Sequence, residues 1–366
     1  MQYKILCVII IGVERNYILP FYPIHSKNEN FFREMFSFFL FIIFLEANMN
    51  NPFPYSDDNK RYHTWNYHLR HTFGGKVMKI SLNAGFTCPN IDGTKGVGGC
   101  SYCSSSGSGD FAGNPEDKLL MQFEDVKSKL HKKWSEGKYM PYFQAYTNTY
   151  APAEKLRKCF EPMLRQPDVV GLSIATRADC LPDEVLDYLS ELNERTYLLV
   201  ELGLQSVYDK TGERINRCHT YAEFLEGYNK LKERNIRVCV HLINGLPGED
   251  KAMMLESARQ VAALKPYCVK LHLLHVLKNT RIAKELEAGE FRLLTREEYV
   301  DIIVSQLELF PPETVIQRLT GDGGKDSLIG PEWSLKKFVV LNEIDKEMLR
   351  RDSWQGKYEA CSSSCS

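Results

Sequence analysis

The chain has 366 residues, of which 43% are hydrophobic and 25% are charged, and its formal net charge is −1 at neutral pH. This composition is typical of a soluble globular protein and excludes a broadly basic nucleic-acid binder, although it allows a local basic patch. Eleven cysteines is an odd number, and most of them lie in surroundings where free thiols are normal. We therefore expect a reducing, cytoplasmic location.

The first 48 residues differ in character from the rest of the chain. They contain two apolar runs, at 5–13 and 35–45, and each run is shorter than the roughly 20 residues that span a bilayer. Met49 then begins an ordinary polar stretch. We expect residues 1–48 to be a non-native or disordered extension from an over-extended gene start, and no stable membrane association. The alternative is a membrane-associating N-terminal hairpin.

From about residue 76, short apolar runs alternate with helical patterns. We expect six strands, at 77–82, 142–146, 169–175, 197–204, 237–243 and 269–276. We expect helices at 119–134, 153–164, 183–193, 221–234 and 251–264. Thr220 and Glu223 have the spacing of a capping box for the fourth of these helices, and Asp179 or Asp183 is the expected cap of the third.

Strict alternation of strands and helices predicts an α/β fold with parallel strands that helices cover on their outer face. Six units are too few for a closed eight-stranded barrel, so we expect a partial (β/α)6 TIM-like barrel over residues 76–280. Short extensions flank it: a cap at 49–75, a helical and irregular extension at 281–350, and a disordered tail at 351–366. Two cysteines of the tail, Cys361 and Cys365, have the spacing of a metal pair, but the low complexity of the segment favours disorder.

Three cysteines lie in one glycine-rich loop after the first predicted strand, as Cys88-x11-Cys100-x2-Cys103. A zinc site would need a fourth ligand at short spacing, and neither His71 nor Cys159 forms a regular pair with the loop. Disulfides would need an oxidising compartment. Three thiolates cannot complete the four-cysteine shell of an ordinary 4Fe–4S cluster, so one iron would stay open to bind a substrate or cofactor.

Polar side chains follow the second and third predicted strands. Thr147, Asn148 and Thr149 offer oxygens that can accept hydrogen bonds from an amino group, or they form an ordinary turn. Arg177 can clamp a carboxylate through two parallel hydrogen bonds, or it pairs with Asp179. In a barrel of parallel strands these positions lie at the end where the chemistry takes place.

The fourth predicted strand carries Glu201 and Gln205, which point to the same face because side chains alternate along a strand. That face lines the barrel, where a buried carboxylate needs partners such as ribose hydroxyls. Arg217 lies near a helix start, which is unfavourable for a cation, so we expect a carboxylate to hold it. The turn at Gly245 lets the backbone approach a flat ring, as an adenine site requires, whereas His241 is interpreted as a core histidine.

These motifs together resemble a known family. The segments Glu201–Ser206, Ile215–His219 and Gly245–Gly248 follow the three-cysteine loop in order, and that loop ends in Cys-aromatic-Cys with Tyr102 as the aromatic residue. Over roughly residues 50–350 the chain resembles radical S-adenosylmethionine (SAM) enzymes of the elongator-catalytic-subunit type, and more closely the bacterial YtqA/YhcC group. One departure is Cys218, where relatives commonly have glycine.

The resemblance implies two cofactors, a 4Fe–4S cluster and SAM. It makes Cys88, Cys100 and Cys103 the cluster ligands, and it assigns no catalytic residue. The implied SAM contacts are Tyr102, Thr147, Asn148, Thr149, Glu201, Gln205, Arg217 and Gly245. It further implies that the reduced cluster cleaves SAM, that a 5′-deoxyadenosyl radical takes a hydrogen atom from a substrate, and that a flavodoxin or ferredoxin supplies the electron.

The substrate expected from the resemblance is tRNA. Elongator-type enzymes build a carboxymethyl group on the wobble uridine with an acetyl-CoA domain, for which the roughly 90 residues after the last predicted barrel strand are too few. The YtqA-like group has been linked to a later step, in which carboxymethylaminomethyl is trimmed to aminomethyl, and we expect this reaction. The alternatives are a radical SAM enzyme that acts on a small molecule or protein, and a non-catalytic iron–sulfur sensor.

Two further segments bear on RNA binding. Residues 61–71 mix cationic and aromatic side chains, which suits contact with a nucleic-acid backbone and base stacking, or they form a packed cap. Residues 317–324 are glycine-rich and are expected to line the mouth of the barrel. They are not a phosphate loop, because they lack its lysine-serine ending.

Overall fold

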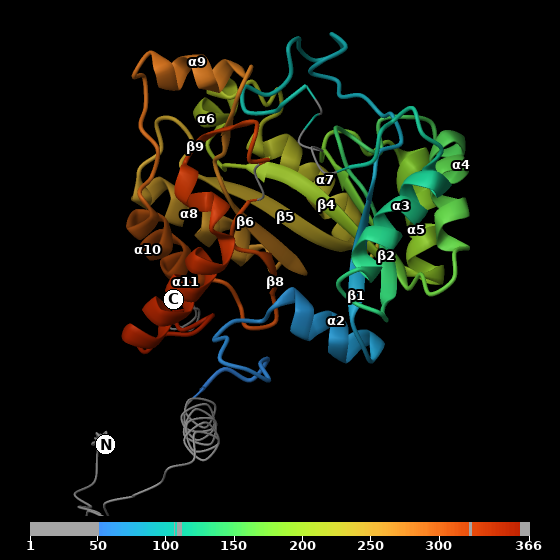
Figure 1. Ribbon diagram of the computed structural model, residues 1–366. Helices are drawn as coiled ribbons and strands as arrows, with labels where there is room; N and C mark the ends of the chain where they lie inside the picture. The colour runs from blue at the N-terminus through green and yellow to red at the C-terminus, as the bar shows by residue number, and fades with distance from the viewer. Residues whose placement is uncertain (1–50, 106, 108–111, 322–323, 359–366) are drawn as a thin grey trace, which may run out of the picture. The chain divides into compact units, whose positions relative to one another are not determined.

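The computed structural model describes residues 51–105, 107, 112–321 and 324–358 (Figure 1). The predictions for residues 1–48 and for the cysteines of the tail lie outside these residues. In the part that is described, every helix is too short or too polar to cross a bilayer.

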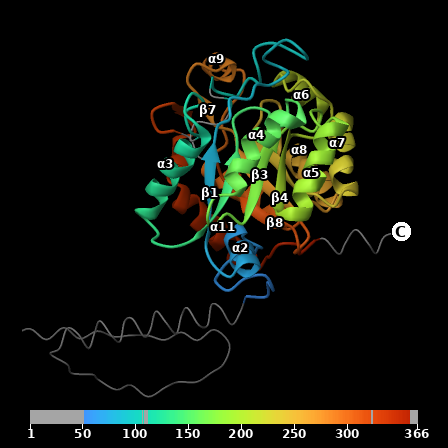
Figure 2. The ribbon, with the colours of Figure 1, turned by 90° about the vertical axis from the view of Figure 1, so that its right-hand side faces the viewer.

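A parallel sheet of seven strands forms the centre of the fold, in the order β1-β2-β3-β4-β5-β6-β8. The strands are β1 (Val77–Leu82), β2 (Lys138–Phe143), β3 (Gly171–Thr176), β4 (Tyr197–Gln205), β5 (Arg237–Asn244), β6 (Cys268–Leu273) and β8 (Val315–Arg318). The sheet curls into a half-barrel (Figures 1 and 2), which confirms the predicted partial TIM-like barrel.

The prediction of six strands missed one strand of this sheet. β8 comes from the extension that was expected to be helical and irregular, and it pairs with β6 through Cys268–Val315 and Val269–Ile316. A strand of four residues is too short to show a period in the sequence. A second, two-stranded sheet joins β7 (Val276–Leu277) to β9 (Leu328–Gly330).

Helices cover the outer face of the sheet, as Figure 2 shows for α3, α4, α5 and α7. The helices that follow successive strands are α3 (Leu119–His131), α4 (Ala153–Leu164), α5 (Asp183–Arg195), α7 (Tyr221–Glu233) and α8 (Lys251–Ala263), close to the predicted ranges. The remaining α-helices of the described chain are α2 (Trp65–Phe73), α6 (Asp209–Arg214), α9 (Arg281–Glu287), α10 (Arg296–Leu307) and α11 (Lys337–Arg350). Outward-facing strand residues such as Val200 and Leu202 pack against this layer and form the main core.

The cap expected for α5 is wrong. Pro182 occupies the N-cap position, and no side chain caps the helix. Asp183 is instead the first helical residue, where its charge suits the helix dipole. Asp179 lies outside the helix and pairs with Arg177, which removes it as a cap.

The N-terminal segment closes the bottom of the half-barrel. α2 lies against both edge strands, β1 and β8, and Thr64 forms a parallel bridge to Ile316. Leu69 of this helix packs on an apolar layer of inward-facing residues, namely Met140, Tyr197, Leu199, Cys239, Cys268 and Val315. Arg61 and His63 are also buried, so the packed-cap interpretation of residues 61–71 fits these side chains.

The capping box at the start of α7 is confirmed. Thr220 Oγ1 accepts a hydrogen bond from the Glu223 amide at 3.1 Å, and Glu223 Oε2 accepts one from the Thr220 amide at 2.7 Å. We expect Thr220→Ala to lower the free energy of unfolding by about 1 kcal/mol, because it leaves an amide at the helix start unpaired. Urea unfolding measures this, and Thr220→Ser, which keeps the oxygen, should unfold like the wild type. Equal stability of the alanine variant would contradict the prediction.

Candidate functional site

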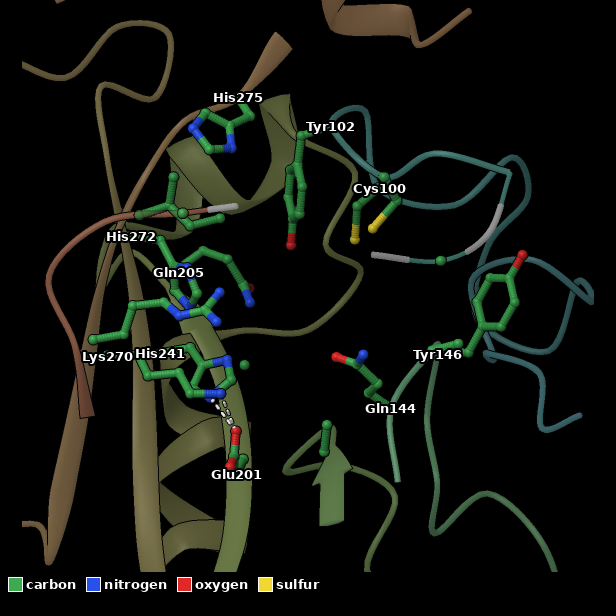
Figure 3. Close-up of a pocket in the computed structure, with 18 of the residues that line it drawn as sticks. Cys100, Tyr102, Gln144, Tyr146, Glu201, Gln205, His241, Lys270, His272 and His275 are labelled. Carbon is green, nitrogen blue, oxygen red and sulfur yellow. Dashed lines mark hydrogen bonds and ion pairs between the residues drawn. The ribbon is translucent and has the colours of Figure 1, made fainter. Parts of the chain in front are cut away.

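A cavity of about 810 Å³ lies at the C-terminal ends of the strands and extends into the half-barrel (Figure 3). The three predicted cluster ligands, Cys88, Cys100 and Cys103, all line it. The inward-facing side chains of the strands form the rest of its wall and its floor. Gln317 and Gly321 line it too, as expected for the segment 317–324.

Asn90 organises the cysteine loop. Its Oδ1 accepts a hydrogen bond from Cys88 Sγ at 2.8 Å, and its Nδ2 donates to Cys100 Sγ at 3.3 Å and to the Asn216 carbonyl at 3.0 Å. From the other side, Asn216 Nδ2 donates to the Gly99 carbonyl at 2.6 Å. The loop is therefore fastened to the turn after α6, and two of its thiols are held by the same amide side chain.

The three thiols suit cluster ligation. None of the three forms a disulfide bond, and the hydrogen bond with Cys103 is the main reason that the pKa of Cys100 falls to about 6, where the thiolate dominates at neutral pH. Burial raises the pKa of Cys88, although a hydrogen bond from Thr147 Oγ1 at 3.2 Å lowers it in part. No three His, Cys, Asp or Glu side chains of the described chain converge to hold a single metal ion. A cluster takes each thiolate on a different iron, so separate thiols on one wall fit it.

The predicted contacts near the loop divide into two groups. Tyr102 and Thr147 line the cavity, and Figure 3 shows Tyr102 beside Cys100. Asn148 and Thr149 do not line it. Asn148 Nδ2 donates to the Ala175 carbonyl at 2.9 Å and Thr149 Oγ1 to the Cys180 carbonyl at 2.6 Å, so both brace the turn after β2.

Arg217 is buried, and its guanidinium is largely occupied by the protein itself. It donates to the carbonyl oxygens of Leu204 and Ser206, both at 2.6 Å, and of His219 at 2.9 Å. Asp209, at 3.2 Å, is the carboxylate that holds it. Four of its five N–H groups are thus used, and this geometry supports a role in shaping the turn more than a direct contact with SAM.

Arg177 also makes a structural ion pair. Its Nε and Nη2 donate to the two oxygens of Asp179 at 2.9 and 2.8 Å, and its Nη1 donates to the Arg217 carbonyl at 2.6 Å. Asp179 in turn binds Lys95 of the cysteine loop at 2.7 Å. The ion-pair alternative therefore describes Arg177, and the pair secures the loop.

Gln205 and Gly245 differ in position. Gln205 lines the cavity, and its backbone is in the left-handed region with φ of 65°. A Cβ atom at Gly203 would lie only 2.5 Å from the side-chain nitrogen of Gln205. Gly245 has φ of 88° but is absent from the cavity lining, and a Cβ there would meet Leu294 at 3.2 Å. The turn at Gly245, which was predicted to contact adenine, therefore does not line the cavity.

Glu201 lies at the floor of the cavity with no exposed surface, and its partners are protein groups. Its Oε1 accepts hydrogen bonds from Lys79 and from Ser173 Oγ, the latter at 2.6 Å, and its Oε2 accepts from Lys270 and bonds His241 Nε2 at 3.0 Å. These four protein groups, and not ribose hydroxyls, satisfy the carboxylate in this structure. Despite burial, Lys270 and Lys79 hold the pKa of Glu201 well below its usual range.

A polar layer surrounds Glu201, and each strand of the main sheet contributes at least one polar residue that lines the cavity or bonds Glu201. Its members are Lys79, Tyr142, Ser173, Glu201, His241, Lys270 and Arg318. Reasoning from sequence missed both lysines, and His241 borders the cavity instead of filling the core. The signal was present, since single polar residues alternate with apolar ones in the strands VMKISL and CVKLHL.

Comparison with known proteins agrees with this geometry. Residues 93–261 match the family model of the radical SAM superfamily, and residues 266–350 match that of the radical SAM C-terminal domain. The chain is 56% identical to protein YtqA of Bacillus subtilis (strain 168) over 309 residues, which is 84% of this chain and 96% of YtqA. It is 36% identical to protein YhcC of Escherichia coli (strain K12) over 76% of this chain and 89% of YhcC.

More distant similarities reach the elongator type. The tRNA uridine(34) acetyltransferase of Methanocaldococcus jannaschii is 28% identical over 156 residues, which is 42% of this chain but 28% of that protein. The structure of Methanocaldococcus infernus Elp3 with an N-terminal deletion matches with a TM-score of 0.57 at 17% sequence identity. The match covers 76% of this chain and 64% of the Elp3 chain. This match shows the shared fold. The chain therefore belongs to the radical SAM superfamily, as the cysteine loop and the half-barrel predicted.

Proposed function

We propose that this radical SAM enzyme modifies the wobble uridine of tRNA by trimming its carboxymethylaminomethyl group to aminomethyl. The observation that carries the proposal is the composition of the cavity, in which a wall of three thiols stands above a floor rich in lysine. The volume of about 810 Å³ is near the upper end of the roughly 300–1,000 Å³ range of ligand pockets, which suits SAM together with a nucleoside side chain.

The cofactors would be a 4Fe–4S cluster on Cys88, Cys100 and Cys103, with SAM beside it. When bound, they supply the reductive cleavage of SAM that starts hydrogen-atom abstraction. Tyr102, Thr147 and Gln205 line the space next to the thiols and would position SAM. The half-barrel would exclude water from the reacting atoms and orient the substrate, which is the part of the task that belongs to the protein.

The proposed reaction balances with SAM as the oxidant. The carbon next to the nitrogen in the carboxymethyl group loses two electrons, and hydrolysis with one water breaks the N–C bond. The products are the aminomethyl group on tRNA, glyoxylate and two protons. SAM would supply the oxidising equivalents, with both electrons and one of the protons recovered in methionine and 5′-deoxyadenosine. An electron donor such as flavodoxin or ferredoxin would reduce the cluster beforehand.

One comparison supports tRNA as the substrate class, because a relative named tRNA uridine(34) acetyltransferase matches part of this chain. The Elp3 structure adds only that the fold is shared. The aligned segment is only 28% of the acetyltransferase, so most of that protein has no counterpart in the alignment. The proposal is therefore trimming of an existing group and not acetyl transfer.

The test is anaerobic turnover. The protein would be reconstituted with iron and sulfide and then given dithionite, SAM and bulk tRNA from a strain that lacks this gene. We expect 5′-deoxyadenosine to form faster with tRNA, together with aminomethyluridine and glyoxylate in equal amounts. Mass spectrometry measures all three products.

Other outcomes separate the alternatives. Formation of 5′-deoxyadenosine without any dependence on tRNA would overturn the tRNA proposal and point to a small-molecule or protein substrate. No 5′-deoxyadenosine from a fully loaded cluster would indicate an iron–sulfur sensor. The matched control is Cys159→Ala, which removes a half-buried thiol of α4 that is not part of the cavity lining and should leave turnover intact.

A further inference from the structure

We propose that Lys79 and Lys270, held apart by Glu201, form the site at the floor of the cavity that binds the substrate's carboxylate. This inference rests on the proposed function and names the part of the substrate that reaches deepest into the half-barrel. The two lysines come from β1 and β6, on opposite sides of Glu201 on β4.

The floor of the cavity carries more positive than negative charge, and a bound anion would balance it. Among the described residues that line the cavity, Glu201 is the only carboxylate, whereas the lining includes Lys79, Lys270 and Arg318. Glu201 pairs with both lysines, so two cations share one anion. A carboxylate that enters from the cavity would balance the second lysine, and pairing stabilises a charge that is removed from water.

Donors remain for such a ligand. Lys79 Nζ bonds Glu201 and, at 3.2 Å, Ser173 Oγ, while Lys270 Nζ bonds Glu201 and, at 3.4 Å, Tyr142 Oη. An ammonium group has three N–H donors, so one N–H of each lysine has no partner among these groups. The side chain of Lys79 is 20% exposed and that of His241 is 17% exposed, which leaves both open to the cavity.

Glu201 preorganises the two lysines. Each of its oxygens binds one lysine, and Ser173 and His241 fix the carboxylate itself. The ammonium groups are therefore positioned before a ligand arrives, which lowers the entropic cost of binding. Burial lowers the pKa of Lys79, with Lys270 adding to this effect against the charge of Glu201, and a bound carboxylate would favour the charged form.

The position favours a carboxylate on a flexible arm over a backbone phosphate. Along β4, Gly203 and Gln205 line the cavity beyond Glu201, toward the cysteine wall, as Figure 3 shows for Gln205 and Cys100. A phosphodiester is flanked by two sugars, and the floor lies along the inner face of the sheet, deeper than the ends of the strands. A carboxymethylaminomethyl arm can extend to the floor, which would leave its C–H bonds closer to the cysteines.

The test compares two RNAs on the anaerobically reconstituted enzyme. Both are anticodon stem-loops, one with carboxymethylaminomethyluridine and the other with its neutral primary amide. We expect the wild type to bind the carboxylate about tenfold more tightly, a difference of about 1.4 kcal/mol, because hydrogen bonds to a charged group are stronger than those to a neutral one. Lys79→Met should lose most of this preference and bind the amide like the wild type, and fluorescence anisotropy measures both affinities.

Matched variants keep the test decisive. Lys76→Met removes a lysine that precedes the same strand and is not part of the cavity lining, and it should keep the full preference. Lys79→Arg retains the charge and should restore most of the preference. Lys270→Met offers a second variant if Lys79→Met does not fold, and it is expected to act in the same way.

Each outcome has one meaning. If the wild type trims tRNA but binds both loops equally, the carboxylate site is wrong and the proposed function stands. If Lys79→Met loses affinity for SAM as much as for the carboxylate RNA, the floor binds SAM's own carboxylate and the inference is overturned. If the wild type neither trims nor binds either loop, the proposed function fails and this site fails with it.

Discussion

Replacement of Cys88, Cys100 or Cys103 by Ala, one at a time, is expected to abolish the visible absorbance of the cluster and to lower SAM cleavage by more than about 100-fold. Changes in the outer shell of a metal site typically cost about 10- to 100-fold, and loss of a ligand removes the attachment itself. The three cysteines form no disulfide bond, and they are the only cysteines among the described residues that line this cavity, so no other thiol there replaces a missing one.

Iron and sulfide content and the yield of 5′-deoxyadenosine measure this effect. Cys180→Ala is an informative control, because burial raises the pKa of this thiol to about 12, which makes it a poor ligand, and it does not line the cavity. It should keep its iron and its activity. Full iron and full activity in any of the three ligand variants would remove that cysteine from the site.

The second large effect concerns stability. Glu201→Gln is expected to lower the free energy of unfolding by about 3–5 kcal/mol, because it leaves Lys79 and Lys270 buried beside each other without their carboxylate. Anaerobic urea unfolding measures this change. Glu154→Gln is the matched control, since this glutamate of α4 pairs with Lys158 in solvent, where an ion pair contributes little to stability. Similar losses of unfolding free energy in the two variants would refute the role of Glu201 as the buried partner of both lysines.

The same carboxylate predicts a dependence on pH. Burial raises the pKa of Glu201, but Lys270 and Lys79 outweigh it and hold the pKa well below the unfolded value of 4.5. A depressed pKa contributes stability that is present above the unfolded pKa and is lost as the pH falls toward the folded pKa. The stability advantage of the wild type over Glu201→Gln should therefore be constant near pH 7 and shrink below about pH 4.5. A difference that does not change with pH would contradict this assignment.

The sequence by itself determined the features that depend on neighbouring residues. The three cysteines and their spacing, the capping box at Thr220, and the order of strands and helices are all local patterns, and the fold confirms the capping box and the order. Apolar runs also placed the six longer strands of the main sheet to within a few residues. Such signals are readable because propensity and periodicity act over a single turn or strand.

Only the tertiary structure decided which distant groups meet. Lys79 and Lys270 lie 122 and 69 residues away from Glu201, and nothing near Glu201 in the sequence shows that cations, and not a ligand, satisfy its charge. The occupied guanidinium of Arg217, the place of Gly245 behind the wall and the addition of β8 to the sheet have the same origin. Each depends on how the half-barrel closes, because a buried polar group is satisfied by whatever the fold brings within hydrogen-bonding distance.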